Sequence, residues 1–107
     1  MCSTITLPGE FLVEIVEILW SDADIEHIAR HGVSPDEVEE VVALRPVWRR
    51  GRQHPVTGRK SLYALGQTEA GRYLFVVLSP RGGSRARCIT ARDMDSATRA
   101  FYMRHRR

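Results

Sequence analysis

The second half of the chain shows the clearest pattern of apolar and polar positions, and this pattern predicts three β-strands. They are expected over residues 60–65, 72–79 and 85–91, separated by two short glycine-containing segments that suit hairpin connections. Residues 73–78 are apolar on both sides of the strand, which is typical of a strand that is buried on two faces. We therefore expect this strand to lie at the centre of a sheet.

Cap signals followed by apolar residues at helical spacing predict three helices. These are expected over residues 22–31, 35–44 and 96–105. Ser21, Ser34 and Asp95 stand at the cap positions, where a side-chain oxygen can accept a hydrogen bond from the first turn. The signal is strongest at the start of the second helix, because Pro35 occupies the first helical position and Glu37 the third, as in a capping box.

The N-terminal segment and the segment before the first strand fit more than one description. In residues 11–20 the glutamates are spaced for one helix face, whereas the valines and isoleucines favour a strand. We prefer a strand, at least over residues 16–20. Residues 1–10 are expected to be a flexible lead-in, and residues 46–58, with two prolines and two glycines, an irregular arginine-rich loop. The complete order predicts a single α+β domain over residues 1–107.

Length and composition exclude several classes of protein. A chain of 107 residues can form one domain around one core and is too short for a large multidomain enzyme. With 43% hydrophobic and 27% charged residues, it is not a mostly disordered chain. The apolar stretch at 11–20 contains two glutamates and follows no basic region, so we expect neither a membrane span nor a signal peptide. Cys2 and Cys88 make no disulfide framework, and a cytoplasmic protein is the default interpretation.

Charge changes this picture, because the net value of +3 conceals a division of the chain. Residues 1–44 hold ten acids and one base, a net charge of −9, whereas residues 45–107 hold fifteen bases and three acids, a net charge of +12. Lys60 is the only lysine, and the other fifteen basic residues are arginines. Since arginine suits the recognition of phosphate and carboxylate groups, the basic half predicts an anion-binding face.

Several short segments follow one another across residues 16–105. They are Trp20, Arg30-His31-Gly32-Val33, Gly71-Arg72, Ile89-Thr90-Ala91-Arg92 and Tyr102. In this order and spacing they resemble the BrnT family of bacterial toxins. The resemblance implies a compact RelE-like fold, ribonuclease activity within a type II toxin–antitoxin pair, and neutralisation by a cognate antitoxin. It also implies that the antitoxin is a dimeric DNA-binding protein that represses the shared operon.

Two arginines of the predicted meander are candidates for a phosphate site. If Ser79 and Arg85 flank the second hairpin as a pair, antiparallel counting places Arg72 directly opposite Arg92 on one face. Like charges in that position repel each other, and a bound phosphate would remove the repulsion. The alternative is that a one-residue slip in the strand register separates the two arginines, or that Asp93 or Asp95 neutralises them.

Tyr102 lies in the predicted last helix, where Ala97, Ala100 and Phe101 are expected to form the buried face. Tyr102 would then project with basic residues such as Arg99, so that it could stack on an unpaired RNA base. The alternative is a partly buried tyrosine that packs against the edge of the sheet.

The histidines could move protons during RNA cleavage. His27 and His31 are four residues apart and therefore share a helix face, although His31 could instead hydrogen-bond the end of its helix. A zinc site would need further ligands, and no matching spacing exists. His54, in the arginine-rich loop, could act in the same way or be a solvated loop residue.

The Arg49–Lys60 segment is the best candidate for an arm that contacts RNA, and the basic residues of greatest interest lie in this segment and in the last helix. They are Arg49, Arg50, Arg59, Lys60 and Arg99. A run of charges often forms a solvated face, but the excess of arginine over lysine favours recognition of phosphate or of an acidic partner.

We therefore predict a metal-independent endoribonuclease without a cofactor, in which Arg72 and Arg92 hold the scissile phosphate and His31 or Tyr102 deprotonates the 2′-hydroxyl. The alternative is a non-catalytic RelE-like module that only binds an antitoxin or nucleic acid. Its support is that the resembled family usually has asparagine at the position of His27 and glutamate at that of Thr98. We do not expect a transcriptional regulator acting alone, because the pattern contains no convincing helix-turn-helix.

Overall fold

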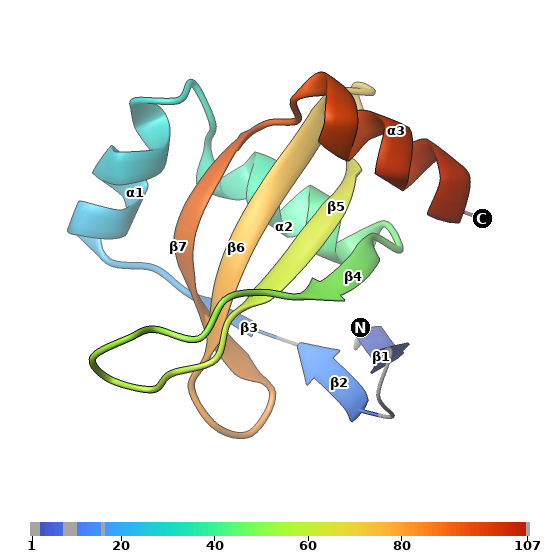
Figure 1. The fold of residues 1–107 in the computed structure, drawn as a ribbon. Coiled ribbons are helices and arrows are strands. Elements are labelled where there is room, and N and C mark those ends of the chain that lie inside the picture. The colour runs from blue at the N-terminus through green and yellow to red at the C-terminus, as the bar shows by residue number, and fades with distance from the viewer. Residues whose placement is uncertain (1–2, 8–10, 16, 107) are drawn as a thin grey trace.

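The computed structural model describes residues 3–7, 11–15 and 17–106, which form an α+β arrangement around a five-stranded sheet (Figure 1). The strand order in this sheet is β3-β7-β6-β5-β4. These strands are β3 (Glu17–Leu19), β4 (Val47–Arg50), β5 (Leu62–Gln67), β6 (Tyr73–Pro80) and β7 (Arg85–Asp93). β3 runs parallel to β7, and the other pairs are antiparallel. The prediction that residues 73–78 form the central strand is confirmed.

Helices cover both faces of the sheet. Helices α1 (Asp22–Ala29) and α2 (Pro35–Ala43) lie on one face, and α3 (Ser96–His105) lies at one end of the other face (Figure 1). All three predicted caps are present, and the Ser34 and Glu37 side chains form the complete capping box. The α+β class and the three helices are therefore confirmed, because these local signals agree with the packing.

The core lies between the sheet and the helix pair α1 and α2. Its fully buried members include Leu74, Val76 and Leu78, which alternate along β6, and Val38 and Val41 of α2. Burying each such side chain contributes about 1.5–3 kcal/mol to folding. The same alternation turns the residues between them toward the other face of the sheet. That second face is consequently free to carry polar and aromatic groups.

An ion pair fixes the first helix to the sheet. Asp24 of α1 is buried, and its two carboxylate oxygens accept hydrogen bonds of 2.8 Å each from the Arg87 guanidinium of β7. Hydrogen bonding to Arg87 holds the pKa of Asp24 below its usual range, despite the opposing effect of burial. This ion pair, together with the burial of Ile28 in the core, holds α1 beside β7.

The structure differs from the sequence-based assignment in the segments before the meander. Strand β4 forms inside the predicted irregular loop, because Trp48 is buried against the core while the prolines lie outside the strand. The predicted lead-in contains β1 (Ser3–Leu7), which pairs antiparallel with β2 (Phe11–Ile15). The preferred strand over residues 16–20 corresponds to β3, although residue 16 lies outside the described residues.

The register of the β6–β7 hairpin differs from the prediction. Ser79 pairs with Arg87 rather than Arg85, because β6 extends through Pro80 before the turn. A bulge then adds one residue, Ile89, to β7, so that Val77 pairs with Thr90. The prediction that Arg72 stands opposite Arg92 was therefore wrong. The structure also differs from the predicted alternative of a one-residue slip, because Arg92 pairs with Phe75, three residues beyond Arg72.

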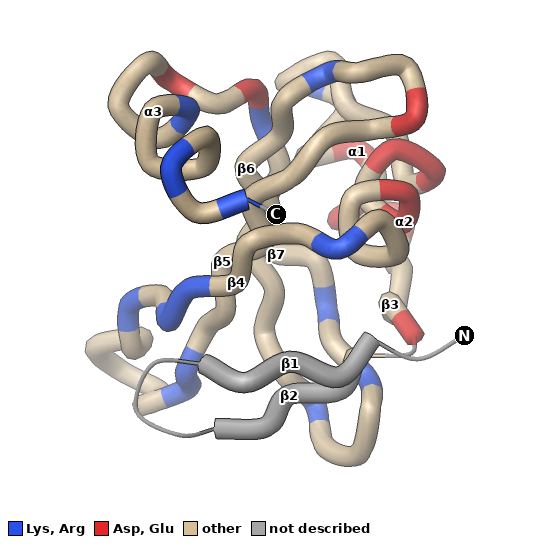
Figure 2. The backbone as a smooth tube through the Cα atoms, turned by 90° about the vertical axis from the view of Figure 1, so that its right-hand side faces the viewer, with Lys and Arg blue, Asp and Glu red and all other residues tan. Residues whose placement is uncertain are grey.

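The division of charge along the sequence becomes a division in space. Acidic residues gather on α1 and α2, whereas basic residues are prominent on α3 and on the loop that joins β4 to β5 (Figure 2). As for the membrane, no helix within residues 3–7, 11–15 and 17–106 combines the length and the apolar character needed to span one.

Candidate functional site

The sheet face that α1 and α2 leave uncovered carries a row of aromatic side chains. Tyr73 and Phe75 alternate with the buried core residues of β6, and Tyr63 lies beside Phe75 with a ring-centroid distance of 4.8 Å. All three side chains are partly exposed. Partly exposed rings on a sheet surface are platforms on which unpaired bases can stack.

Arginine side chains lie over the rings of this face. The Arg92 guanidinium stands 4.9 Å from the centre of the Phe75 ring, and that of Arg99 stands 3.9 Å from the Tyr73 ring. Such cation–π contacts leave the N–H groups at the guanidinium edge able to bind phosphate oxygens. The combination of rings and positive charge suits a single-stranded nucleic acid.

Arg92 itself is exposed, and it lies opposite Phe75 in the register of β6 and β7. Within the described part of the chain it forms no ion pair. The nearby Asp95 carboxylate accepts a 2.7 Å hydrogen bond from the Thr98 backbone N–H, as the cap of α3. Arg92 therefore keeps a cation available on the aromatic face.

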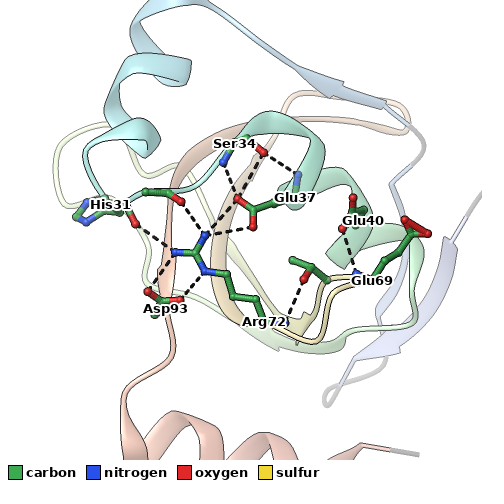
Figure 3. Close-up of polar contacts among 9 residues, drawn as sticks. His31, Ser34, Glu37, Glu40, Glu69, Arg72 and Asp93 are labelled. Atoms are coloured by element: carbon green, nitrogen blue, oxygen red, sulfur yellow. Dashed lines mark hydrogen bonds and ion pairs between the residues drawn. The ribbon is translucent and has the colours of Figure 1, made fainter.

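Arg72 has a different environment, and its guanidinium is engaged by protein groups (Figure 3). Its Nε and Nη2 atoms donate to the two Asp93 carboxylate oxygens at 2.8 and 3.1 Å. Its Nη1 atom donates to the Gly32 carbonyl oxygen at 2.7 Å and to the Glu37 carboxylate at 3.2 Å. The His31 carbonyl oxygen accepts a weaker hydrogen bond of 3.4 Å from Nη2.

These contacts make Arg72 a junction between the turn after α1, the start of α2 and the end of β7. Hydrogen bonding to Asp93 raises the pKa of the Arg72 guanidinium, and the same contact lowers the pKa of Asp93. The predicted alternative of neutralisation by Asp93 is confirmed for Arg72. The structure does not bring Arg72 and Arg92 together as a phosphate-binding pair.

Tyr102 is the buried residue of α3, so its predicted projection into solvent was wrong. Its ring packs edge to face against Tyr73 with centroids 6.0 Å apart. The predicted alternative is right that Tyr102 packs against the sheet, but the side chain is buried and contacts the central strand β6 and not an edge strand. The expected buried face was also wrong, because Ala97 and Ala100 are exposed. Because α3 has few apolar residues, the Tyr102 ring, which packs against the sheet, determines which face of the helix is buried.

The two histidines of the first helix share a face, as their spacing predicts. Their ring centroids are 5.6 Å apart, and His27 Nε2 lies 3.1 Å from the Thr90 hydroxyl oxygen of β7. The His31 ring is exposed and points away from Arg72 (Figure 3). Thr90 and Arg92 are two residues apart on β7, about 7 Å along the strand. The histidine pair is therefore next to the strand that carries Arg92.

The described residues contain no group of three or more His, Cys, Asp or Glu side chains that could hold a metal ion.

A groove of about 560 Å³ lies beside the aromatic row, between the β4–β5 loop and the ends of β6 and β7. The loop crosses in front of the lower parts of these strands (Figure 1). Among the described residues, its lining contains basic, polar and apolar side chains but no aspartate or glutamate. The lining residues are Arg52, Gln53, His54, Pro55, Thr57, Arg59, Lys60, Ser61, Val77, Ser79, Arg81, Arg87 and Ile89.

The residues predicted to contact RNA are distributed over this surface. Arg49 lies over the Phe101 ring of α3 at 4.1 Å, and Arg99 lies over Tyr73. Arg59 and Lys60 line the groove. Arg50 pairs with the core residue Leu62, so its position on β4 belongs to the other face of the sheet. His54 has a structural task, since its Nδ1 atom accepts hydrogen bonds from the backbone N–H groups of residues 56 and 57.

Sequence reasoning missed the aromatic row and two arginines of the groove, Arg81 and Arg87, whereas Arg52 lies within the predicted Arg49–Lys60 arm. Phe75 and Tyr73 occupy alternate positions in a strand that was interpreted as apolar on both sides, and that alternation was the available signal. Arg52 and Arg81 are 29 residues apart in sequence and meet only because the loop folds back over the sheet. No local sequence pattern predicts that Arg52 and Arg81 line the same groove.

Comparison with known proteins adds one match. The sequence model of a family described as "Ribonuclease toxin, BrnT, of type II toxin-antitoxin system" matches residues 20–97. This range includes helices α1 and α2, strands β4 to β7, the groove and Arg92, and it stops near the start of α3. No curated protein matches the chain.

Proposed function

The chain belongs to the BrnT family of ribonuclease toxins of type II toxin–antitoxin systems, and from this premise we propose that it is a metal-independent endoribonuclease. The observation that carries the proposal is Arg92, an exposed cation held over Phe75 beside a pair of histidines. Guanidinium and imidazole groups can together supply what RNA cleavage through the 2′-hydroxyl needs. One stabilises charge on the phosphate, and the other transfers protons.

In this mechanism Arg92 binds the scissile phosphate through the N–H groups of its guanidinium edge. The 2′-oxygen of the RNA loses its proton and attacks phosphorus, the bond from phosphorus to the 5′-oxygen breaks, and the leaving oxygen takes up a proton from water. The products are a 2′,3′-cyclic phosphate and a free 5′-hydroxyl. Arg92 stabilises the additional negative charge that develops on the phosphate oxygens during this step.

We assign proton transfer from the 2′-hydroxyl to His31, whose exposed ring can reach substrate above the edge of β7. His27 is a positioning residue, because its contacts to Thr90 and to the His31 ring fix the orientation of the pair. Arg72 and Tyr102, which the sequence had suggested for catalysis, are instead assigned to the framework, since protein groups occupy both side chains.

Arg49 and Arg99 are assigned to binding of the RNA backbone beside α3, and Arg59 and Lys60 to binding within the groove. Arg50 stays a weaker candidate, because its strand position belongs to the opposite face. Membership of a toxin–antitoxin family also implies an antitoxin partner. We propose that this partner is a dimeric DNA-binding protein, that it covers the basic face, and that both proteins act in the cytoplasm.

Incubation of the purified protein with single-stranded RNA in excess EDTA tests the proposal. We expect cleavage at the same rate with and without EDTA, because arginine and histidine supply the chemistry. A heat-denatured sample of the same preparation is the control for contaminating nuclease that survives heating. Cleavage that stops in EDTA and returns with a divalent metal would exclude the metal-independent mechanism. Tight RNA binding without cleavage would favour the non-catalytic binding module.

A further inference from the structure

The groove under the β4–β5 loop is partly open to solvent, and its size and lining suit a binding site. Its volume of about 560 Å³ falls within the range of roughly 300–1,000 Å³ that is typical of small-molecule sites. Val77 and Ile89 give it an apolar floor, and Arg52, Arg59 and Arg81 give it cationic walls. This arrangement suits a ligand that combines a flat apolar ring with a phosphate.

Hydrogen bonds within the loop hold the walls of this groove in place. The Tyr63 hydroxyl accepts a 3.3 Å hydrogen bond from the Arg52 backbone N–H, and the Ser61 hydroxyl donates to the Arg52 carbonyl oxygen at 2.6 Å. At the loop tip the Gln53 side-chain amide donates to the Gly58 carbonyl oxygen at 2.9 Å. A preorganised loop loses little conformational entropy when a ligand binds.

The charge in the groove is available to a ligand at two positions in particular. Within residues 3–7, 11–15 and 17–106, neither Arg59 nor Arg81 forms an ion pair. Arg87 differs from them, because its guanidinium is bound to Asp24. Since none of the described lining residues is acidic, a phosphate entering the groove meets attraction from several sides.

We infer that the groove is a subsite for one unpaired nucleotide of the RNA substrate, with the base against Val77 and Ile89 and the phosphate on Arg59 and Arg81. The inference deepens and rests on the proposed function. The groove begins at Val77, next to Phe75 on the same face of β6, and its far end at Ser79 is about 13 Å from Phe75 along the strand. A single RNA strand therefore runs from the aromatic row into the groove.

This subsite selects single-stranded over double-stranded RNA. A base can lie on the groove floor only when it is neither paired nor stacked in a helix. Binding of a duplex would therefore require the free energy of unpairing and unstacking that base. The enzyme then holds its substrate at the scissile phosphate and at a nucleotide on one side of it. The β4–β5 loop is a specificity element in this arrangement.

The test compares the wild-type protein with the double variant R59Q/R81Q and with R45Q, in which the replaced arginine lies in the turn between α2 and β4 outside the groove. The probe is a fluorescent single-stranded oligonucleotide with 2′-O-methyl groups, which cannot be cleaved, and its Kd is measured by anisotropy over a range of salt concentrations. We expect R59Q/R81Q to weaken binding roughly tenfold. We also expect the slope of log Kd against log salt to fall by about 0.7 for each arginine removed.

R45Q is expected to bind as the wild type does, and thermal melting checks that all three proteins are folded. Pairing the probe with its complement should abolish the difference between wild type and R59Q/R81Q. Unchanged affinity and salt slope in R59Q/R81Q would overturn the inference. Two other results would also overturn it, both in a variant that keeps its affinity for RNA. Loss of adenosine monophosphate binding would make the groove a site for free nucleotides, and loss of polyglutamate binding would make it a site for an acidic protein.

The outcomes separate this inference from the proposed function. If the wild-type protein binds the probe through the groove but does not cleave unmodified RNA, the proposed function fails and the subsite stands. If it cleaves RNA in EDTA and R59Q/R81Q binds and cleaves as the wild type does, the subsite fails and the proposed function stands.

Discussion

Replacing Arg92 with alanine is expected to lower the rate of RNA cleavage by about 10²–10³-fold, the loss that follows removal of one group stabilising a transition-state charge. The variant should fold normally, because Arg92 is exposed and its contact with Phe75 contributes only about 0.5–1 kcal/mol. The measurement is the single-turnover cleavage rate of an RNA oligonucleotide, together with the melting temperature of each protein.

Arg85 provides the matched control for this experiment, since it is an exposed arginine on the same strand. Arg85→Ala removes the same charge from β7 at the end away from the histidine pair, and it should keep nearly full activity. Equal losses in the two variants would mean that cleavage depends on overall charge, and retained activity in Arg92→Ala would remove Arg92 from the mechanism.

The substitution Arg72→Met is expected to have the second large effect, a loss of folding stability. Methionine keeps much of the side-chain volume but leaves Glu37 and Asp93 without their cation, and it removes the donor to the Gly32 carbonyl oxygen. Glu37 is 27% exposed and Asp93 is 63% exposed, so the uncompensated charge of Glu37 contributes more of the loss. We expect the free energy of unfolding to fall by about 2–4 kcal/mol.

Urea denaturation measures this change, and Arg30→Met is the control. Arg30 forms an ion pair with Glu26 that is 71% and 74% exposed, so its loss should change stability by no more than about 0.5 kcal/mol. Where Arg72→Met remains folded, its cleavage rate should follow the folded fraction. A variant with wild-type stability and no cleavage would contradict this account and return Arg72 to the phosphate site.

Local signals in the sequence were sufficient to predict the helices and the central strand. Ser21, Ser34 and Asp95 each act as the expected cap, because a cap depends on a side chain and a backbone N–H only three residues away. The apolar run of β6 likewise marks its own burial. These features are decided within one element, so the residues of that element carry the information.

The relation between strands could not be predicted in the same way. Whether Arg72 faces Arg92 depends on where the β6–β7 hairpin closes and on the bulge at Ile89. The turn uses Gly82 and Gly83 with positive φ angles of 91° and 58°. Such glycines indicate a turn but do not say how many residues it leaves unpaired.

The candidate site shows the same limit. The kinds of residue in the site can be read from the sequence, because the basic half supplies the arginines and the spacing of His27 and His31 in the acidic half pairs the histidines. The partners of each arginine cannot, because Arg72 reaches Glu37 across 35 residues and Asp93 across 21. Tertiary packing therefore decides which arginine is bound by acids and which stays available for phosphate.

The central claim, metal-independent cleavage through the 2′-hydroxyl, is tested most directly with two versions of one single-stranded oligonucleotide in excess EDTA. One version is entirely RNA, and the other carries a single 2′-deoxynucleotide on the 5′ side of the cleaved bond. We predict that the RNA version is cut to a product ending in a 2′,3′-cyclic phosphate and that the deoxy version stays intact there, because it lacks the attacking oxygen. Cleavage of both versions at the same bond would contradict the account.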